Sequence, residues 1–321
     1  MISQEIDFSS GNTYNGCEIT AENILSLVPA TPESLISEVH NFCDKDPRIL
    51  PMLSGTDWYE KDRNFNRAPL TVTSREDAIY TSFWGSRREY SKTLGNKSNY
   101  NFVLPLNSEW LIKASGGGNR RENINSYFGH EYGTALSQEQ IERFILECGK
   151  TYQTVSRMAY WLRSKEIKNK LNLNRIGVPK KYLVRLPNRS AHIDDTNYVV
   201  VAKNIAGAVP ITQTDLPRDP EVIKQLTQWI GYSAAWSINP ENILAHENKA
   251  WVVDLEQPNV HKPTDFFHKN MKVHRSNVLH GWNELETNII VPYGETHAVD
   301  MNQILEEKKK VQEQIQQTWT N

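Results

Sequence analysis

The sequence predicts an α+β fold with a helical N-terminal extension, a small antiparallel sheet lobe and a shortened, mainly helical lobe. Two kinds of segment support this prediction. Short runs rich in aromatic and β-branched residues are typical of strands, and longer runs with apolar residues at helical spacing are typical of helices. The expected boundaries are 1–76 for the helical and loop-rich extension, 77–205 for the sheet with a helix, and 206–321 for the helical region.

The bulk composition excludes several classes of protein. The chain has 36 basic and 38 acidic residues among 321, so it lacks the basic surplus of a general nucleic-acid binder. It contains no apolar run long enough for a membrane span, and its first residues are polar and acidic, unlike a secretory signal. The three separated cysteines suit a reducing compartment. We therefore expect a cytoplasmic protein without nucleic-acid or membrane partners. Export without a cleaved signal, as for some bacterial effectors, would leave no trace in the sequence.

Strands are expected in short runs that are rich in aromatic or β-branched residues. These runs are Ala78–Trp84, Asn101–Leu106, Glu109–Ala114, Lys181–Leu186 and Asn197–Ala202. Lys113 lies near the end of the third run, on the face that Leu111 shares. A lysine among apolar residues on a strand is usually an edge charge or a snorkelling side chain. A functional cation is the alternative, and the neighbouring elements distinguish the two.

Helices are expected where capping signals precede apolar residues at helical spacing. The clearest begin at Thr31, at the capping box Ser137–Gln140 and at Asp219, and two more span Tyr152–Lys170 and about Asp300–Thr318. Between Glu256 and the last of these helices the sequence is expected to be rich in loops. The helical lobe is therefore predicted to be short.

A hairpin is expected in the stretch from Ser237 to Glu256. Two short strand patterns flank the turn residues around Asn248, so the two open ends of the hairpin would lie close together. Asn242 stands at one of these ends and Asp254 at the other. An amide oxygen and a carboxylate are ligands that suit Mg²⁺ together with substrate phosphates. The hairpin is therefore the candidate functional centre.

The order of these elements resembles that of the protein kinase superfamily. Pro240–Leu244 matches the second half of the catalytic loop of that family, and Val252–Glu256 stands where the family has two apolar residues followed by Asp-Phe-Gly. Tyr198–Lys203 resembles the strand that leads to the hinge between the lobes. The resemblance covers about Asn101–Asn259 and implies a kinase-like two-lobed fold. Tyr152–Ile205 also resembles uncharacterised kinase-like proteins of intracellular bacteria.

The resemblance implies a role for several residues. Lys113 would contact nucleotide phosphates, and Asn242 and Asp254 would hold Mg²⁺. Backbone groups of the hinge would meet the adenine ring, and these belong to Ala202, Lys203 and Asn204. The implied cofactors are ATP and Mg²⁺.

The lysine of this family pairs with a carboxylate from a helix, and Glu166 is the leading candidate here. It precedes the strand Lys181–Leu186 by about the interval of the family. Glu147 and Glu142 are alternatives. Glu166 could equally be a solvated helix charge beside Lys165.

Other residues depart from the family pattern. Ser237 stands at the position of the catalytic aspartate, and Glu256 replaces the glycine of Asp-Phe-Gly. A general base typically contributes about 10²–10⁴-fold, whereas positioning and charge neutralisation carry most of phosphoryl transfer. We therefore expect a pseudokinase or regulatory module that binds nucleotide and Mg²⁺, with a protein as a further candidate partner. The alternative is an atypical ATP-dependent phosphoryl- or nucleotidyl-transferase that uses Lys113, Asn242, Asp254 and Glu256, with Glu256 as a metal ligand or relocated base.

Two further patterns do not match a known phosphate-binding or metal-binding motif. The glycine run 116–118 precedes two arginines but has neither Walker spacing nor a Gly-x-Gly-x-x-Gly pattern, so a flexible loop is expected. Four histidines recur between 261 and 280 at intervals of six or seven, which does not suit zinc ligands on adjacent helix turns. These histidines are expected to lie on the surface or in loops.

Overall fold

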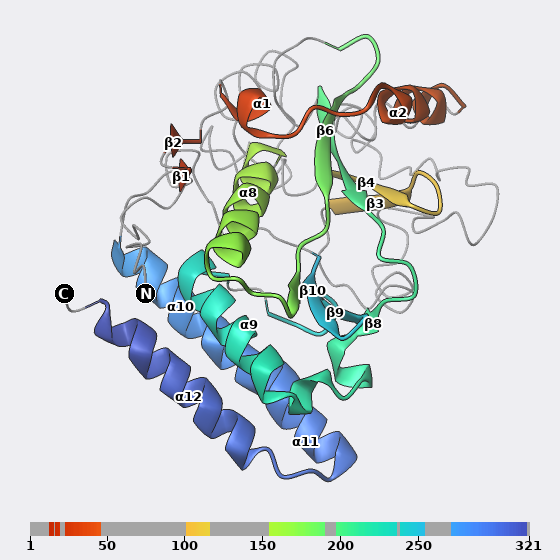
Figure 1. Cartoon of the computed structure of the whole chain (residues 1–321). Coiled ribbons are helices and arrows are strands. Elements are labelled where there is room, and N and C mark those ends of the chain that lie inside the picture. The colour runs from red at the N-terminus through yellow and green to blue at the C-terminus, as the bar shows by residue number, and fades with distance from the viewer. Residues whose placement is uncertain are drawn as a thin grey trace, which may run out of the picture.

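The computed structural model describes residues 13–15, 17–19, 23–45, 101–115, 154–189, 197–235, 238–253 and 271–319. Across these residues the fold is α+β, with two small four-stranded sheets and several helices (Figure 1). The strand expected at Ala78–Trp84, the glycine run and the helix expected after Ser137 lie outside the described residues.

The first four-stranded sheet is antiparallel throughout and has the strand order β3-β4-β7-β6. Its strands are β3 (Asn101–Pro105), β4 (Trp110–Ser115), β6 (Lys181–Arg185) and β7 (Tyr198–Lys203). The bounds agree to within one residue with those expected from the aromatic and β-branched runs. This agreement is understandable because the strand pattern here is continuous and each run ends in turn-forming residues.

Helices cover both faces of this sheet, which explains why β7 is buried along nearly its whole length. Helix α2 (Glu33–Lys45) contacts β6, and its Val39 belongs to the same hydrophobic cluster as Val201 on one face of the sheet. Helix α8 (Thr154–Lys170) places Met158 against Val200 on the other face. Burying side chains of this kind contributes about 1.5–3 kcal/mol each. The small elements β1 (Thr13–Tyr14), β2 (Cys17–Glu18) and α1 (Ile24–Leu27) lie on the α8 side.

The second sheet has the order β5-β10-β9-β8 and pairs β5 in parallel with β10. Its strands are β5 (Ile176–Gly177), β8 (Val209–Pro210), β9 (Ile243–His246) and β10 (Lys249–Val252). The antiparallel pair β9–β10 is the hairpin that the sequence predicts. Its two-residue turn places Glu247 and Asn248 at φ angles of 47° and 57°, as a type I′ turn requires.

A layer of helices packs beneath this second sheet (Figure 1). It comprises η3 (Ile211–Gln213), η4 (Leu216–Arg218), α9 (Pro220–Ser233), α10 (Met271–Leu285), η6 (Glu286–Ile290), α11 (Val291–His297) and α12 (Asn302–Gln317). Two of these helices begin where the sequence indicates. Asp219 caps α9 by accepting the backbone N–H groups of Glu221 and Val222, and α12 corresponds to the expected last helix.

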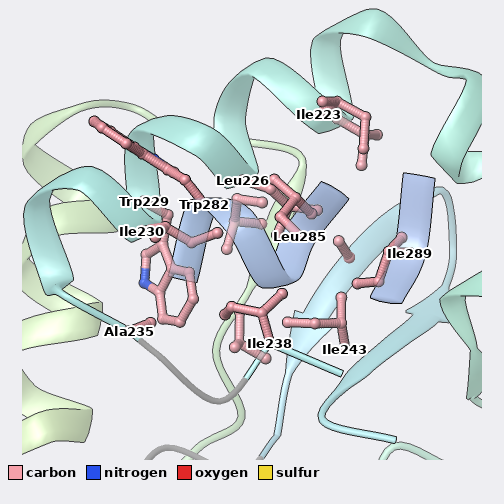
Figure 2. Packing of buried hydrophobic residues seen from close by; sticks show 14 of the residues in the cluster. Ile223, Leu226, Trp229, Ile230, Ala235, Ile238, Ile243, Trp282, Leu285 and Ile289 are labelled. Atoms are coloured by element: carbon pink, nitrogen blue, oxygen red, sulfur yellow. The ribbon is translucent and has the colours of Figure 1, made fainter. Parts of the chain in front are cut away.

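The expectation of a loop-rich region after Glu256 is wrong for the residues from 271 onward. Helices α10, η6 and α11 run almost without interruption from Met271 to His297. Their apolar residues, Trp282 and Ile289 among them, join Trp229 of α9 in the largest core cluster (Figure 2). The helical part of the fold is therefore more extensive than the sequence pattern indicates.

Gly281 explains why α10 can lie so close to the end of α9. A Cβ atom added at Gly281 would stand 1.9 Å from the carbonyl oxygen of Ala235. The glycine therefore marks a close approach between two backbones rather than a helix break. This approach holds α10 against the chain segment that leads into the hairpin.

Candidate functional site

The open end of the hairpin brings Asn242 next to Val253. The backbone N–H of Val253 donates a hydrogen bond of 3.0 Å to the carbonyl oxygen of Asn242. Asn242 is buried, and its own N–H is held by the side chain of Asn239 at 2.9 Å. The hairpin therefore brings Asn242 to Val253, whereas its convergence with Asp254 stays a prediction because Asp254 lies outside the described residues.

Lys113 of β4 reaches the same end of the hairpin. Its Nζ atom donates a hydrogen bond of 3.1 Å to the carbonyl oxygen of Val253, although the two residues are 140 positions apart. The side chain of Lys113 is buried, with 8% of its surface exposed. The backbone of Val253 therefore connects the lysine of the first sheet with Asn242 of the second sheet.

Helix α10 and η6 hold the loop that precedes Asn242. The carboxylate of Glu284 accepts the N–H of Ile238 at 2.8 Å, and the amide of Asn288 donates to the carbonyl oxygen of Ile238 at 2.9 Å. Both backbone groups of Ile238 are therefore fixed by side chains four positions apart. Asn288 lies in a π-helical turn, a distortion that is frequent at functional sites.

Replacing Glu284 by alanine is expected to lower the free energy of unfolding by about 1–3 kcal/mol, because the buried N–H of Ile238 would lose its acceptor. Glu284→Gln keeps an acceptor oxygen and is expected to be milder. Denaturant unfolding measures both, with Glu295→Ala on the exposed surface of α11 as the control. If Glu284→Ala and Glu295→Ala had equal stability, Glu284 would not hold the loop.

The carboxyl end of α9 is capped by side chains from two other helices. The hydroxyl of Tyr160 donates to the carbonyl of Ser233 at 2.8 Å, and Arg163 donates to that of Tyr232 at 3.0 Å. His274 of α10 makes a hydrogen bond with the backbone of Gly231. Burial raises the pKa of Tyr160, so the phenol stays neutral as the donor. These contacts satisfy carbonyl groups that a helix end leaves without helical partners.

Glu166 does not occupy the place expected for it. Its carboxylate lies 2.6 Å from the Nζ of Lys170, one helical turn along α8, and accepts the N–H of Asn15 at 3.3 Å. Among the described residues it makes no ion pair with Lys113, so the expected pairing is corrected. The alternatives Glu142 and Glu147 lie outside the described residues.

The three expected hinge residues lie at the end of β7, beside the start of β4. Trp110 is paired with Lys203, and Leu111 with Ala202, in the antiparallel ladder. Asn204 follows directly and donates its N–H to the carbonyl oxygen of Glu109 at 2.7 Å. Their assignment to a hinge stays a prediction, and the backbone donors of this stretch are engaged within the protein.

Three predicted site residues, Ser237, Asp254 and Glu256, lie outside the described residues. Among the residues that the structure does describe, no group of three or more His, Cys, Asp or Glu side chains could hold a metal ion. A metal at the hairpin would therefore depend on Asp254 and Glu256 in addition to Asn242. Amide and carboxylate oxygens are hard donors, and this chemistry fits Mg²⁺.

Three contributors to this site were not predicted from the sequence. The carbonyl group of Val253 as the partner of Lys113, and the clamp by Glu284 and Asn288, depend on contacts between distant segments. His280 lies on the exposed surface of α10, as expected, 3.3 Å from Glu284, whereas His274 differs from expectation because it is largely buried on the same helix. No local pattern could have signalled these contacts.

Comparisons of the chain with protein-family models, with curated proteins and with solved structures return no match. Within the described segments, none of the helices is both long enough and apolar enough to cross a membrane. Function is therefore inferred from the geometry of the site.

Proposed function

We propose that this chain is a kinase-like protein that binds a nucleotide and Mg²⁺ between the sheet β3-β4-β7-β6 and the hairpin β9–β10. The observation that carries the proposal is the hydrogen bond between Lys113 and the carbonyl of Val253, which precedes Asp254. This contact brings a cation for phosphate groups to the end of the hairpin where Asn242 stands. The two-lobed, kinase-like arrangement is part of the proposal.

The arrangement of elements around Lys113 supports this proposal. Lys113 is paired with Val200, so both side chains lie on the same face of the sheet. Val200 belongs to the cluster that α8 covers. The lysine strand therefore adjoins the expected hinge strand and faces a helix and the hairpin. Bound Mg²⁺ would neutralise phosphate charge, and Asn242 and Asp254 would hold the ion.

The proposed role is that of a pseudokinase or regulatory module, because Ser237 stands where a catalytic base would be expected. A slow phosphoryl- or nucleotidyl-transferase is the second candidate. It is favoured by the same hydrogen bonds, since positioning carries most of the catalysis in phosphoryl transfer. Incubation with labelled ATP separates the two, because only a transferase would label the protein or an added acceptor.

Lys113→Met is expected to weaken the binding of MgATP by about 10–100-fold, which corresponds to the loss of a charge-assisted hydrogen bond. Asp254→Ala is expected to weaken it as well. Isothermal titration calorimetry measures the dissociation constants, and unfolding without ligand verifies the fold of each variant. Lys249→Met, at the turn end of the same hairpin, is the control and should bind like the wild type.

Two outcomes would contradict the proposal. Wild-type protein that shows neither calorimetric binding nor thermal stabilisation with millimolar MgATP would exclude a nucleotide site. A folded Lys113→Met variant with unchanged affinity would exclude the assigned role of this lysine.

A further inference from the structure

The backbone donors at the end of β7 are already used within the protein. The N–H of Lys203 donates to the carbonyl oxygen of Lys180 at 2.8 Å, and that of Asn204 donates to Glu109 at 2.7 Å. Ala202 lies between two strands, paired with Leu111 on one side and with Lys181 on the other. A nucleobase that docked here would have to break hydrogen bonds of the sheet in order to gain its own.

The side chains of Lys203 and Asn204, at the end of β7, are also engaged within the protein. The Nζ of Lys203 lies 2.6 Å from the carboxylate of Glu109 and 5.1 Å from the centre of the Trp110 ring. The amide of Asn204 donates to the carbonyl of Ser108 at 3.0 Å. The turn between β3 and β4 therefore occupies the donors through which this edge would recognise a base. Since a lost hydrogen bond costs about as much as a new one contributes, base contacts here would add little net affinity.

Lys113 brings a cation to the end of the hairpin. Its Nζ atom donates a hydrogen bond of 3.1 Å to the carbonyl oxygen of Val253. An ammonium group in this position suits phosphate groups better than a planar, uncharged base.

We infer that the ligand of this site is held by its phosphate groups and is not selected for its base. The inference rests on the proposed function and specifies its substrate class. The class comprises Mg²⁺ complexes of nucleoside triphosphates with any base, together with inorganic tripolyphosphate. Lys113 contacts these phosphate groups, while the end of β7 contributes no base recognition.

The test compares ligands on the wild-type full chain by isothermal titration calorimetry. The Mg²⁺ complexes of ATP, GTP, CTP, UTP and tripolyphosphate are expected to have dissociation constants within about tenfold of one another. Adenosine is expected to bind at least about a hundredfold more weakly than ATP. A preference for one base greater than tenfold, or adenosine binding comparable to ATP, would overturn the inference while leaving the proposed nucleotide site intact. Absence of binding by every triphosphate would instead refute the proposed function.

Discussion

Replacing Trp282 by alanine is expected to lower the free energy of unfolding by about 3–5 kcal/mol. The side chain has only 1% of its surface exposed, and its indole N–H donates to the carbonyl of Thr227 at 2.9 Å. Its ring also stacks on Trp319 at a centroid distance of 5.8 Å. The substitution would remove these contacts and leave a cavity between α9, α10 and the end of α12. Urea unfolding measures the change in the free energy of unfolding. Far-UV circular dichroism is the suitable signal, because the substitution itself alters the tryptophan fluorescence.

Leu279→Ala is the matched control for this substitution. Leu279 lies three positions away on the same helix and has 48% of its surface exposed. Its removal is expected to change the stability by about 0.5 kcal/mol or less. Equal losses at Leu279 and Trp282 would contradict the packing of α10 against α9.

The stability of the protein is expected to fall by about 2–3 kcal/mol through His274 when the pH drops from 7 to 4. The pKa of His274 is lowered from 6.5 to about 4, first because burial disfavours the charged ring and then because Arg163 and Arg275 lie nearby. A hydrogen bond with the backbone of Gly231 opposes this shift in part. The folded state therefore resists protonation that the unfolded chain accepts.

The sign of this effect follows from the two pKa values. Above pH 6.5 the ring is neutral in both states, so His274 contributes no pH dependence. Between 6.5 and about 4 the unfolded chain binds the additional proton, so the free energy of unfolding falls as the pH falls. Below about 4 both states are protonated and this loss is complete.

His274→Gln isolates the contribution of this residue, because other groups also titrate in the same range. Denaturant unfolding at pH 7 and pH 4 should show a smaller pH dependence in this variant than in the wild type. Identical pH profiles for His274→Gln and the wild type would contradict the burial of an uncharged ring beside two arginines.

The predictions for Glu284, Trp282 and His274 all concern helix α10. This helix packs on α9 through Trp282, meets the end of α9 through His274 and holds the loop before Asn242 through Glu284. Substitutions at its buried positions are therefore expected to affect both stability and the geometry of the hairpin end. Gly281 permits this arrangement through its close approach to the carbonyl of Ala235.

Features with a local physical cause could be predicted from the sequence. Asp219 followed by proline marks the start of α9 because it satisfies free N–H groups of the first turn. The turn at Glu247 and Asn248 follows from the left-handed backbone angles that a two-residue hairpin loop requires. Hairpin pairing then brings Asn242 close to Val253.

Features that depend on distant contacts could not be predicted in the same way. The sequence predicts a loop-rich region around Gly281, yet this residue lies within α10, where the carbonyl of Ala235 leaves no room for a side chain. Glu166 has the spacing of a partner for Lys113, yet its carboxylate pairs with Lys170 on the same helix. Spacing along a helix specifies a face, but it does not specify which cation lies opposite that face.

The candidate site depends both on local sequence effects and on contacts between distant segments. Residue type and short-range hydrogen bonding are sufficient to place an amide oxygen at the open end of a hairpin, since these effects act over a few positions of the chain. The contact between Lys113 and Val253 joins residues 140 positions apart, and the engaged donors of Lys203 and Asn204 depend on neighbouring strands and turns. Such contacts result from the packing of sheets and helices around shared cores. Only that packing determines which cations face the hairpin and which donors are already engaged.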